Sequence, residues 1–261
     1  MSKNPLIVRD GRRFMAPPAS IPVDMQSKRG QFIKPCHVTY QHELEHWPGA
    51  VPDYKIASSV AWGKQTTPDA DIVVVDLEGI WHASWYGPDE RLSRYMVAKL
   101  VNIVKEFRRQ WGHRIRIGAY QVPTSNWWGS VEQFEAGIER IRPALTVMSD
   151  ACIGCYDAYR DDLSFPPAMQ AEVYANIAKR DGLPPLCPFV SRQYWNGDEE
   201  WSGKRIGREE YQSAIKSLAE IPTVERMIVW GRASSLGLID EVDVNETVQA
   251  IEDAGREAVL F

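Results

Sequence analysis

Short runs of apolar residues alternate along this chain with longer segments in which apolar residues recur every three or four positions. Continuous apolar runs indicate strands buried on both faces, whereas the longer period is that of a helix packed along one side. The apolar runs predict strands at 32–40, 71–78, 114–122, 151–158, 186–194 and 226–231. The periodic segments predict helices at 53–63, 87–112, 130–142, 167–180, 207–219 and 242–255.

This alternation of strands and helices predicts a parallel sheet with right-handed crossovers. We expect an α/β fold, a TIM-like (β/α) barrel that is distorted or short of eight strands, because six or seven strands can be counted. A length of 261 residues suits one barrel-sized domain, and no linker divides residues 1–261. Residues 1–30 are rich in Pro, Arg and Gly, which predicts an irregular entry with a short hairpin at Asp10-Gly11.

The strand expected at 71–78 ends in two acids, Asp76 and Glu78. Alternate side chains of a strand share a face, so both carboxylates are expected on the same side. The carboxyl ends of the strands carry the chemistry in (β/α) barrels, and neighbouring carboxylates in different environments can divide the roles of acid and base. In the alternative interpretation, one acid caps the next helix and the other forms a salt bridge.

Tryptophan is the unusual feature of the composition, with 10 residues of this type. Several lie near predicted strand ends and in loops, among them Trp81, Trp128 and Trp230. The face of a tryptophan ring can stack on the apolar face of a sugar ring. For any single tryptophan, however, a place in the hydrophobic core is the better explanation.

Charge and cysteine usage exclude several classes of protein. The net charge of −5 argues against a nucleic-acid-binding surface and against a basic surface for membranes, and no apolar run approaches a membrane span. The first residues lack the apolar core of a secretory signal, which leaves the cytoplasm or a signal already removed. The 4 cysteines are too few for a disulfide framework, so free thiols are expected. The oligomeric state stays open.

The ends of the predicted strands form an ordered series of short motifs. After Asp-Leu-Glu at 76–78 come Gly-Ala-Tyr-Gln-Val-Pro at 118–123, a segment ending in Tyr156, Pro-Phe-Val-Ser-Arg-Gln-Tyr at 188–194, and Val-Trp at 229–230. This series resembles the hyaluronidase-like glycoside hydrolases, which are distorted TIM barrels with an Asp-x-Glu pair. The chain departs from the animal enzymes of that family in being shorter and in lacking their paired disulfide cysteines.

The resemblance implies hydrolysis of a polysaccharide or oligosaccharide, without a cofactor or metal. Glu78 would be the general acid and base, and Asp76 would orient the 2-acetamido group of the sugar, which acts as the nucleophile. Further side chains would bind the substrate: Tyr120, Tyr156, Trp230, Trp81, Trp128, Tyr194 and Asp150. On a sugar without that group, Asp150 and Asp157 are the candidates for nucleophile or base, although capping the following loop is the favoured role of either.

Two other interpretations remain. A carbohydrate-binding barrel without catalysis would keep the aromatic residues but has no use for both acids. His42 and His46 match the His-Glu-x-x-His pattern of zinc hydrolases, but the Pro48 that follows ends any helix there.

Cys152 and Cys155 form a Cys-x-x-Cys pattern, and strand alternation predicts that their thiols face opposite ways as buried apolar groups.

Overall fold

The structure is a computed structural model of the chain. It describes residues 6–10, 37–40, 53–66, 72–76, 90–123, 129–155, 166–192, 205–229, 241–255 and 258–260. The strands are β1 Leu6–Asp10, β2 His37–Tyr40, β3 Ile72–Asp76, β4 Arg116–Tyr120, β5 Phe189–Val190, β6 Arg226–Val229 and β7 Ala258–Leu260. The helices are α2 Asp53–Thr66, α4 Glu90–Trp111, α5 Val131–Leu145, α6 Pro167–Asp181, α7 Arg208–Glu220 and α8 Glu241–Asp253.

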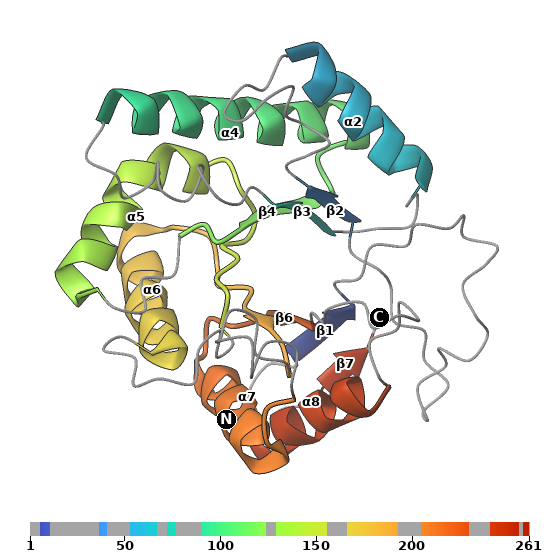
Figure 1. Ribbon diagram of the computed structural model, residues 1–261, viewed down its shortest axis with the longest axis vertical. Helices are drawn as coiled ribbons and strands as arrows, with labels where there is room; N and C mark the ends of the chain where they lie inside the picture. The colour runs from blue at the N-terminus through green and yellow to red at the C-terminus, as the bar shows by residue number, and fades with distance from the viewer. Residues whose placement is uncertain are drawn as a thin grey trace.

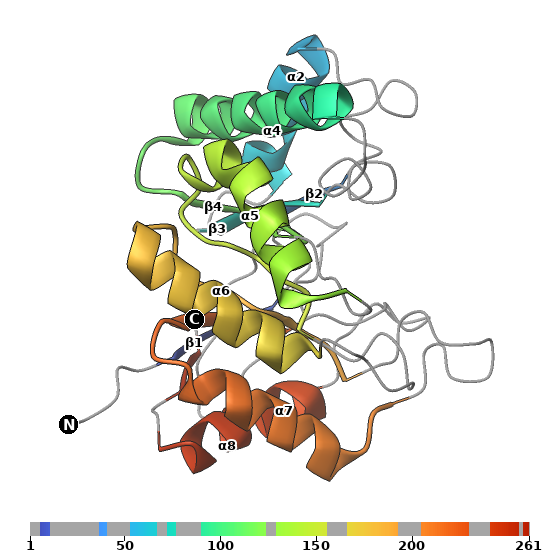
Figure 2. The ribbon, with the colours of Figure 1, turned by 90° about the vertical axis from the view of Figure 1, so that its left-hand side faces the viewer.

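The strands form two parallel sheets that are bridged by an irregular segment. One sheet has the order β2-β3-β4 and the other the order β5-β6-β1-β7. Residues 151–154 lie between them, because Cys152 pairs with Tyr120 of β4 while Gly154 pairs with Phe189 of β5. Helices surround the strands on the outside (Figures 1 and 2). The fold is therefore the predicted distorted (β/α) barrel.

The predicted irregular entry is wrong for residues 6–10. This segment forms β1, which pairs in parallel with β6 on one side and β7 on the other. The apolar run Leu-Ile-Val is too short to stand out among the Pro, Arg and Gly residues that follow, and two neighbouring strands stabilise it in the fold. The short hairpin predicted at Asp10-Gly11 is wrong for the residues before the turn, because Asp10 ends a strand that pairs only in parallel. Gly11 lies outside the described residues.

One face of these strands packs against the helices, and the other face lies in the barrel interior. Val73, Val75, Ile117 and Ala119 belong to the core shared with the helices. Their equally buried neighbours in β3, Ile72 and Val74, lie outside that core cluster and so face the barrel interior. Burial on both faces explains why the sequence of β3 is a continuous run of β-branched residues.

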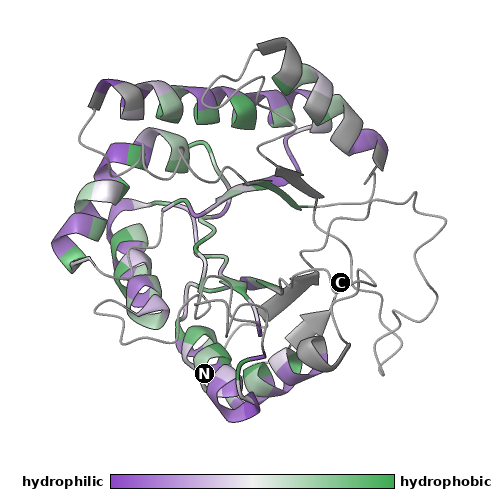
Figure 3. Ribbon diagram, in the orientation of Figure 1, coloured by the Kyte–Doolittle hydropathy of each residue, from purple (hydrophilic) through white to green (hydrophobic). Residues whose placement is uncertain are grey.

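The helices follow the predicted apolar stripes. Hydrophobic and hydrophilic residues alternate along α4 and α5 (Figure 3), and buried residues such as Leu100, Phe107 and Phe134 pack toward the strands. The predicted capping box begins α5: the Ser130 hydroxyl accepts from the Gln133 backbone, and the Gln133 side chain accepts from the Ser130 backbone. Gly182 ends α6 in the left-handed conformation, with φ of 67°.

Candidate active site

The carboxyl ends of β2, β3 and β4 bring two candidate residues into register. Asp76 pairs with Tyr40 on one side and with Tyr120 on the other. Because all three strands are parallel, their carboxyl ends lie at the same edge of the sheet. Asp76 and Tyr120, two of the residues predicted for the site, are therefore neighbours in the fold although 44 positions separate them in sequence.

Tyr120 lies in the barrel interior with its ring held by neighbouring strands. Its side chain is 8% exposed, and its ring packs on Phe189 of β5 with the ring centres 5.0 Å apart. The Tyr120 hydroxyl accepts a long hydrogen bond, 3.4 Å, from Nε2 of Gln121. Since Gly154 stands between the two strands without a side chain, the rings of Tyr120 and Phe189 can meet across it.

Gln121 has a backbone conformation that is rare for its residue type. Its φ is 57°, in the left-handed region, and the residue is 4% exposed. Non-glycine residues in this region are uncommon and cluster at functional sites. Gln121 lies within the motif at 118–123, but the sequence assigns it no role, because nothing in the local pattern predicts a positive φ for glutamine.

Asp150 belongs to a different part of the barrel from Asp76 and Tyr120. It is 1% exposed, and Arg116, the first residue of β4, donates to both of its carboxylate oxygens at 2.8 and 2.7 Å. Arg226, the first residue of β6, lies 3.5 Å away. Asp150 is therefore at the amino ends of the strands, opposite the end where Tyr120 lies, and the structure does not bring it together with the predicted site.

The ion pair of Asp150 has a clear electrostatic effect on Arg116. Burial disfavours the charged guanidinium, but the hydrogen bonds and negative charge of Asp150 outweigh it and raise the pKa of Arg116 above its usual value. This partly exposed strand residue thus stays charged beside the buried Asp150. We interpret the group formed by Arg116, Asp150 and Arg226, here called the lower ion cluster, as a structural element.

The cysteines of the Cys-x-x-Cys pattern face opposite ways, as predicted. Cys155 belongs to the core shared with the helices, whereas the Cys152 thiol approaches Gly118 on the interior side. Burial raises the pKa of the Cys155 thiol well above its usual range, which suppresses thiolate chemistry. Among the described residues, no group of three or more His, Cys, Asp or Glu side chains could hold a metal ion.

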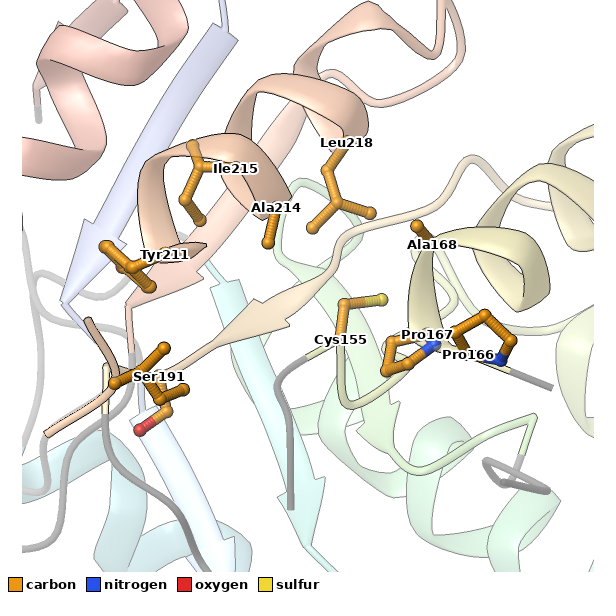
Figure 4. A pocket seen from close by; sticks show the side chains of 10 residues that line it. Cys155, Pro166, Pro167, Ala168, Ser191, Tyr211, Ala214, Ile215 and Leu218 are labelled. Atoms are coloured by element: carbon orange, nitrogen blue, oxygen red, sulfur yellow. The ribbon is translucent and has the colours of Figure 1, made fainter. Parts of the chain in front are cut away.

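A small apolar cavity lies beside the strands, between α6 and α7 (Figure 4). Its volume is about 110 Å³, and Cys155, Ser191 and Tyr211 are among its lining residues. The Tyr211 hydroxyl is hydrogen-bonded to Thr247 of α8 at 2.7 Å. The cavity has few polar groups to orient a substrate and does not include Tyr120, so we do not assign the chemistry to it.

The end of β5 carries a charged residue whose partner lies on α8. Arg192 follows β5, and its Nη1 atom lies 2.5 Å from Oε2 of Glu246. Arg208, at the start of α7, is 3.5 Å from the other carboxylate oxygen. Both side chains of the shorter pair are 11% exposed, so this bridge ties the end of β5 to the helix layer.

Several predicted residues cannot be placed by the structure. The side chain of Asp76 lies outside what is described, although its backbone ends β3. Other candidates lie wholly outside the described residues: Glu78, Trp81, Trp128, Tyr156, Asp157, Tyr194, Trp230, His42 and His46. In the described part of the chain, no helix is both long enough and apolar enough to cross a membrane.

This chain is similar to solved structures in its fold. No protein-family model matches this chain, and no curated protein matches it by sequence. An engineered protein is similar with a TM-score of 0.50 and 13% identity, over 98% of this chain and 71% of that chain.

Two endo-beta-1,4-mannanases are also similar to this chain. A double mutant from Cellulomonas fimi has a TM-score of 0.48 and 11% identity, over 98% of this chain and 75% of that one. The GH26 catalytic domain from Bacillus sp. JAMB-750 has a TM-score of 0.48 and 11% identity, over 99% and 87%. At these identities the likeness concerns the arrangement of the backbone.

Proposed function

We propose that this protein is a glycoside hydrolase in which Glu78 is the general acid and base and Asp76 is the orienting carboxylate. The observation that carries the proposal is the pairing of Asp76 with Tyr120 at the carboxyl ends of β3 and β4. In (β/α) barrels this end of the strands holds the reacting groups. An acid beside an aromatic residue at this edge suits a sugar, which has both hydroxyls and apolar ring faces.

The alternation along β3 supports the choice of these two acids. Ile72 and Val74 face the barrel interior, and strand alternation leads us to expect Asp76 on the same face. If the strand geometry extends by two residues, Glu78 joins the same face. Asp150 is left out of the proposal, because the lower ion cluster holds it at the opposite ends of the strands.

The proposed substrate is a glycan with a 2-acetamido sugar at the cleaved position. Glu78 gives its proton to the glycosidic oxygen while the acetamido oxygen attacks the anomeric carbon and the bond to the leaving sugar breaks. Glu78 then removes a proton from the water that opens the cyclic intermediate. Tyr120 would contact the sugar in this subsite, with Tyr156, Trp230, Trp81, Trp128 and Tyr194 as the further proposed contacts.

Substitution of the two acids tests this function. Glu78→Gln should lower turnover of unactivated oligosaccharides by at least ~10², because it removes the transferable proton. Asp76→Asn should also lower turnover, and most strongly on 2-acetamido substrates. The matched control is Glu172→Gln, the same change at an exposed residue of α6, and it should leave turnover unchanged. Activity is measured on defined oligosaccharides with and without 2-acetamido groups.

Four results would contradict parts of the proposal. Near-full activity of Glu78→Gln would remove Glu78 from its role. Glycan binding without any hydrolysis would favour the non-catalytic carbohydrate-binding barrel. A covalent glycosyl-enzyme trapped on a protein side chain would rule out substrate assistance, and loss of activity with a zinc chelator would favour the His42 and His46 alternative.

A further inference from the structure

We propose that the cavity between α6 and α7 is a binding site for a small neutral apolar molecule, of the size and kind of cyclopentane. The cavity lies on the helix side of the strands, because its lining residues Cys155 and Ile215 belong to the core that the strands share with the helices. Tyr120 faces the barrel interior, on the other side of the strands. The cavity is therefore separate from the site proposed for the glycan, and each can be tested without the other.

Much of the cavity wall consists of residues that have no alternative rotamers. Pro166, Pro167 and Ala168 lie at the start of α6, and Ala214 lies across the cavity from them on α7 (Figure 4). A proline ring is fixed to the backbone, and an alanine has no side chain that could reach across the space. These residues cannot rotate into the cavity, so its volume stays open.

The chemistry of the lining favours an apolar guest over water. A buried water needs about two to four polar partners, and an apolar cavity without them stays dry. The Cys155 thiol is a weak hydrogen-bonding group, and the Tyr211 hydroxyl is engaged with Thr247 of α8 at 2.7 Å. Besides these two, the described lining contains one more polar side chain, that of Ser191, which gives too few groups to hold a water firmly.

The volume of the cavity limits the size of the guest. An engineered apolar cavity of about 150 Å³ binds benzene or xenon. The cavity between α6 and α7 is smaller, at about 110 Å³, so it suits a compact hydrocarbon or a xenon atom. A guest of this size supplies the van der Waals contacts that the lining atoms lack across the empty space.

A guest can reach this cavity from the protein surface. Ala168 and Ala214, which face each other across it, are only half-buried, and Pro166 is exposed. The space between the two helices therefore extends close to the solvent at this point. Entry does not require the strands or the core behind them to open.

Binding is measured by nuclear magnetic resonance on protein with ¹³C-labelled isoleucine and leucine methyl groups, with cyclopentane and xenon as probes. The methyl signals of the lining residues Ile206, Ile215 and Leu218 should shift saturably with either probe. We expect a Kd of about 1 mM for cyclopentane, the order of magnitude that so few atoms allow. Acetamide, a polar molecule of similar size, should leave these signals unmoved, because the cavity offers too few partners for its amide.

Two substitutions fill the cavity from opposite sides. Ala214→Leu puts an isobutyl group into the space from α7 and should abolish binding of cyclopentane. Ala168→Val narrows the space from α6, and it serves as the second test if Ala214→Leu does not fold. The matched control is Ala98→Leu, the same change at an exposed residue of α4, and it should keep the Kd of the parent. Because the guest binds the folded state, cyclopentane should raise Tm in the parent and in Ala98→Leu but not in Ala214→Leu.

Three results would overturn the proposal. The first is a folded parent protein in which no lining methyl signal shifts saturably with cyclopentane. The second is unchanged binding in both Ala214→Leu and Ala168→Val, because the guest would then lie elsewhere on the protein. The third is equal binding of acetamide, which would contradict the apolar class of the ligand.

Discussion

Replacing Asp150 by asparagine should destabilise the protein and leave its chemistry intact. Asp150 is 1% exposed and accepts two hydrogen bonds from Arg116, while Arg226 lies 3.5 Å away. Removing one member of a buried ion pair leaves the remaining charge without compensation, which costs about 3–5 kcal/mol. Asparagine keeps the shape and one acceptor oxygen, so we expect the lower end of that range, about 3 kcal/mol.

The assay is urea unfolding followed by tryptophan fluorescence, with thermal unfolding as a second measure. A loss of about 3 kcal/mol should lower Tm by about 6–12 °C for a chain of this size. The matched control is Glu225→Gln, because Glu225 pairs with the same Arg226 at 3.1 Å but has a side chain that is 50% exposed. Exposed ion pairs contribute little, so the control should cost less than about 1 kcal/mol.

The reasoning fails if Asp150→Asn unfolds at the same urea concentration as the parent. It also fails if the variant is folded at the assay temperature but has lost oligosaccharide turnover, because Asp150 would then belong to the reacting groups. Retained turnover in a destabilised variant would confirm that the lower ion cluster has a structural role.

Two further predictions concern packing and pH. Gly118→Ala places a Cβ atom 2.4 Å from the Cys152 thiol, so it should cost about 1–3 kcal/mol in urea unfolding. The double variant with Cys152→Ala should lose less than the sum of the two single losses. Hydrogen bonds from Arg180 and Arg142 hold the pKa of Asp181 well below its usual value of 3.8, so their stabilisation is present above that pH and is lost as the pH falls below it. Arg142→Ala should flatten this acid-side loss of stability, and an unchanged pH profile of Tm would contradict the assignment.

The sequence predicted the elements whose pattern is long or strongly apolar. The stripe of α4, the capping box at Ser130 and the apolar run of β3 each depend on contacts within a few residues, so the local pattern contains the information. A short strand can lack such a local pattern. Residues 6–10 form a strand through pairing with β6 and β7, which are more than 200 positions away and leave no local signal.

The candidate site also combines features that the local sequence predicts with features that depend on long-range contacts. The sequence by itself determined that Asp76 lies at the end of a buried strand and that Tyr120 lies near the end of the next one, because each fact belongs to one segment. Only the tertiary structure decided that these two residues are neighbours, that Asp150 lies at the other end of the barrel between two arginines, and that Gln121 turns its amide toward Tyr120. The physical reason is that strand register, burial of charge and a positive φ are all stabilised by partners distant in sequence.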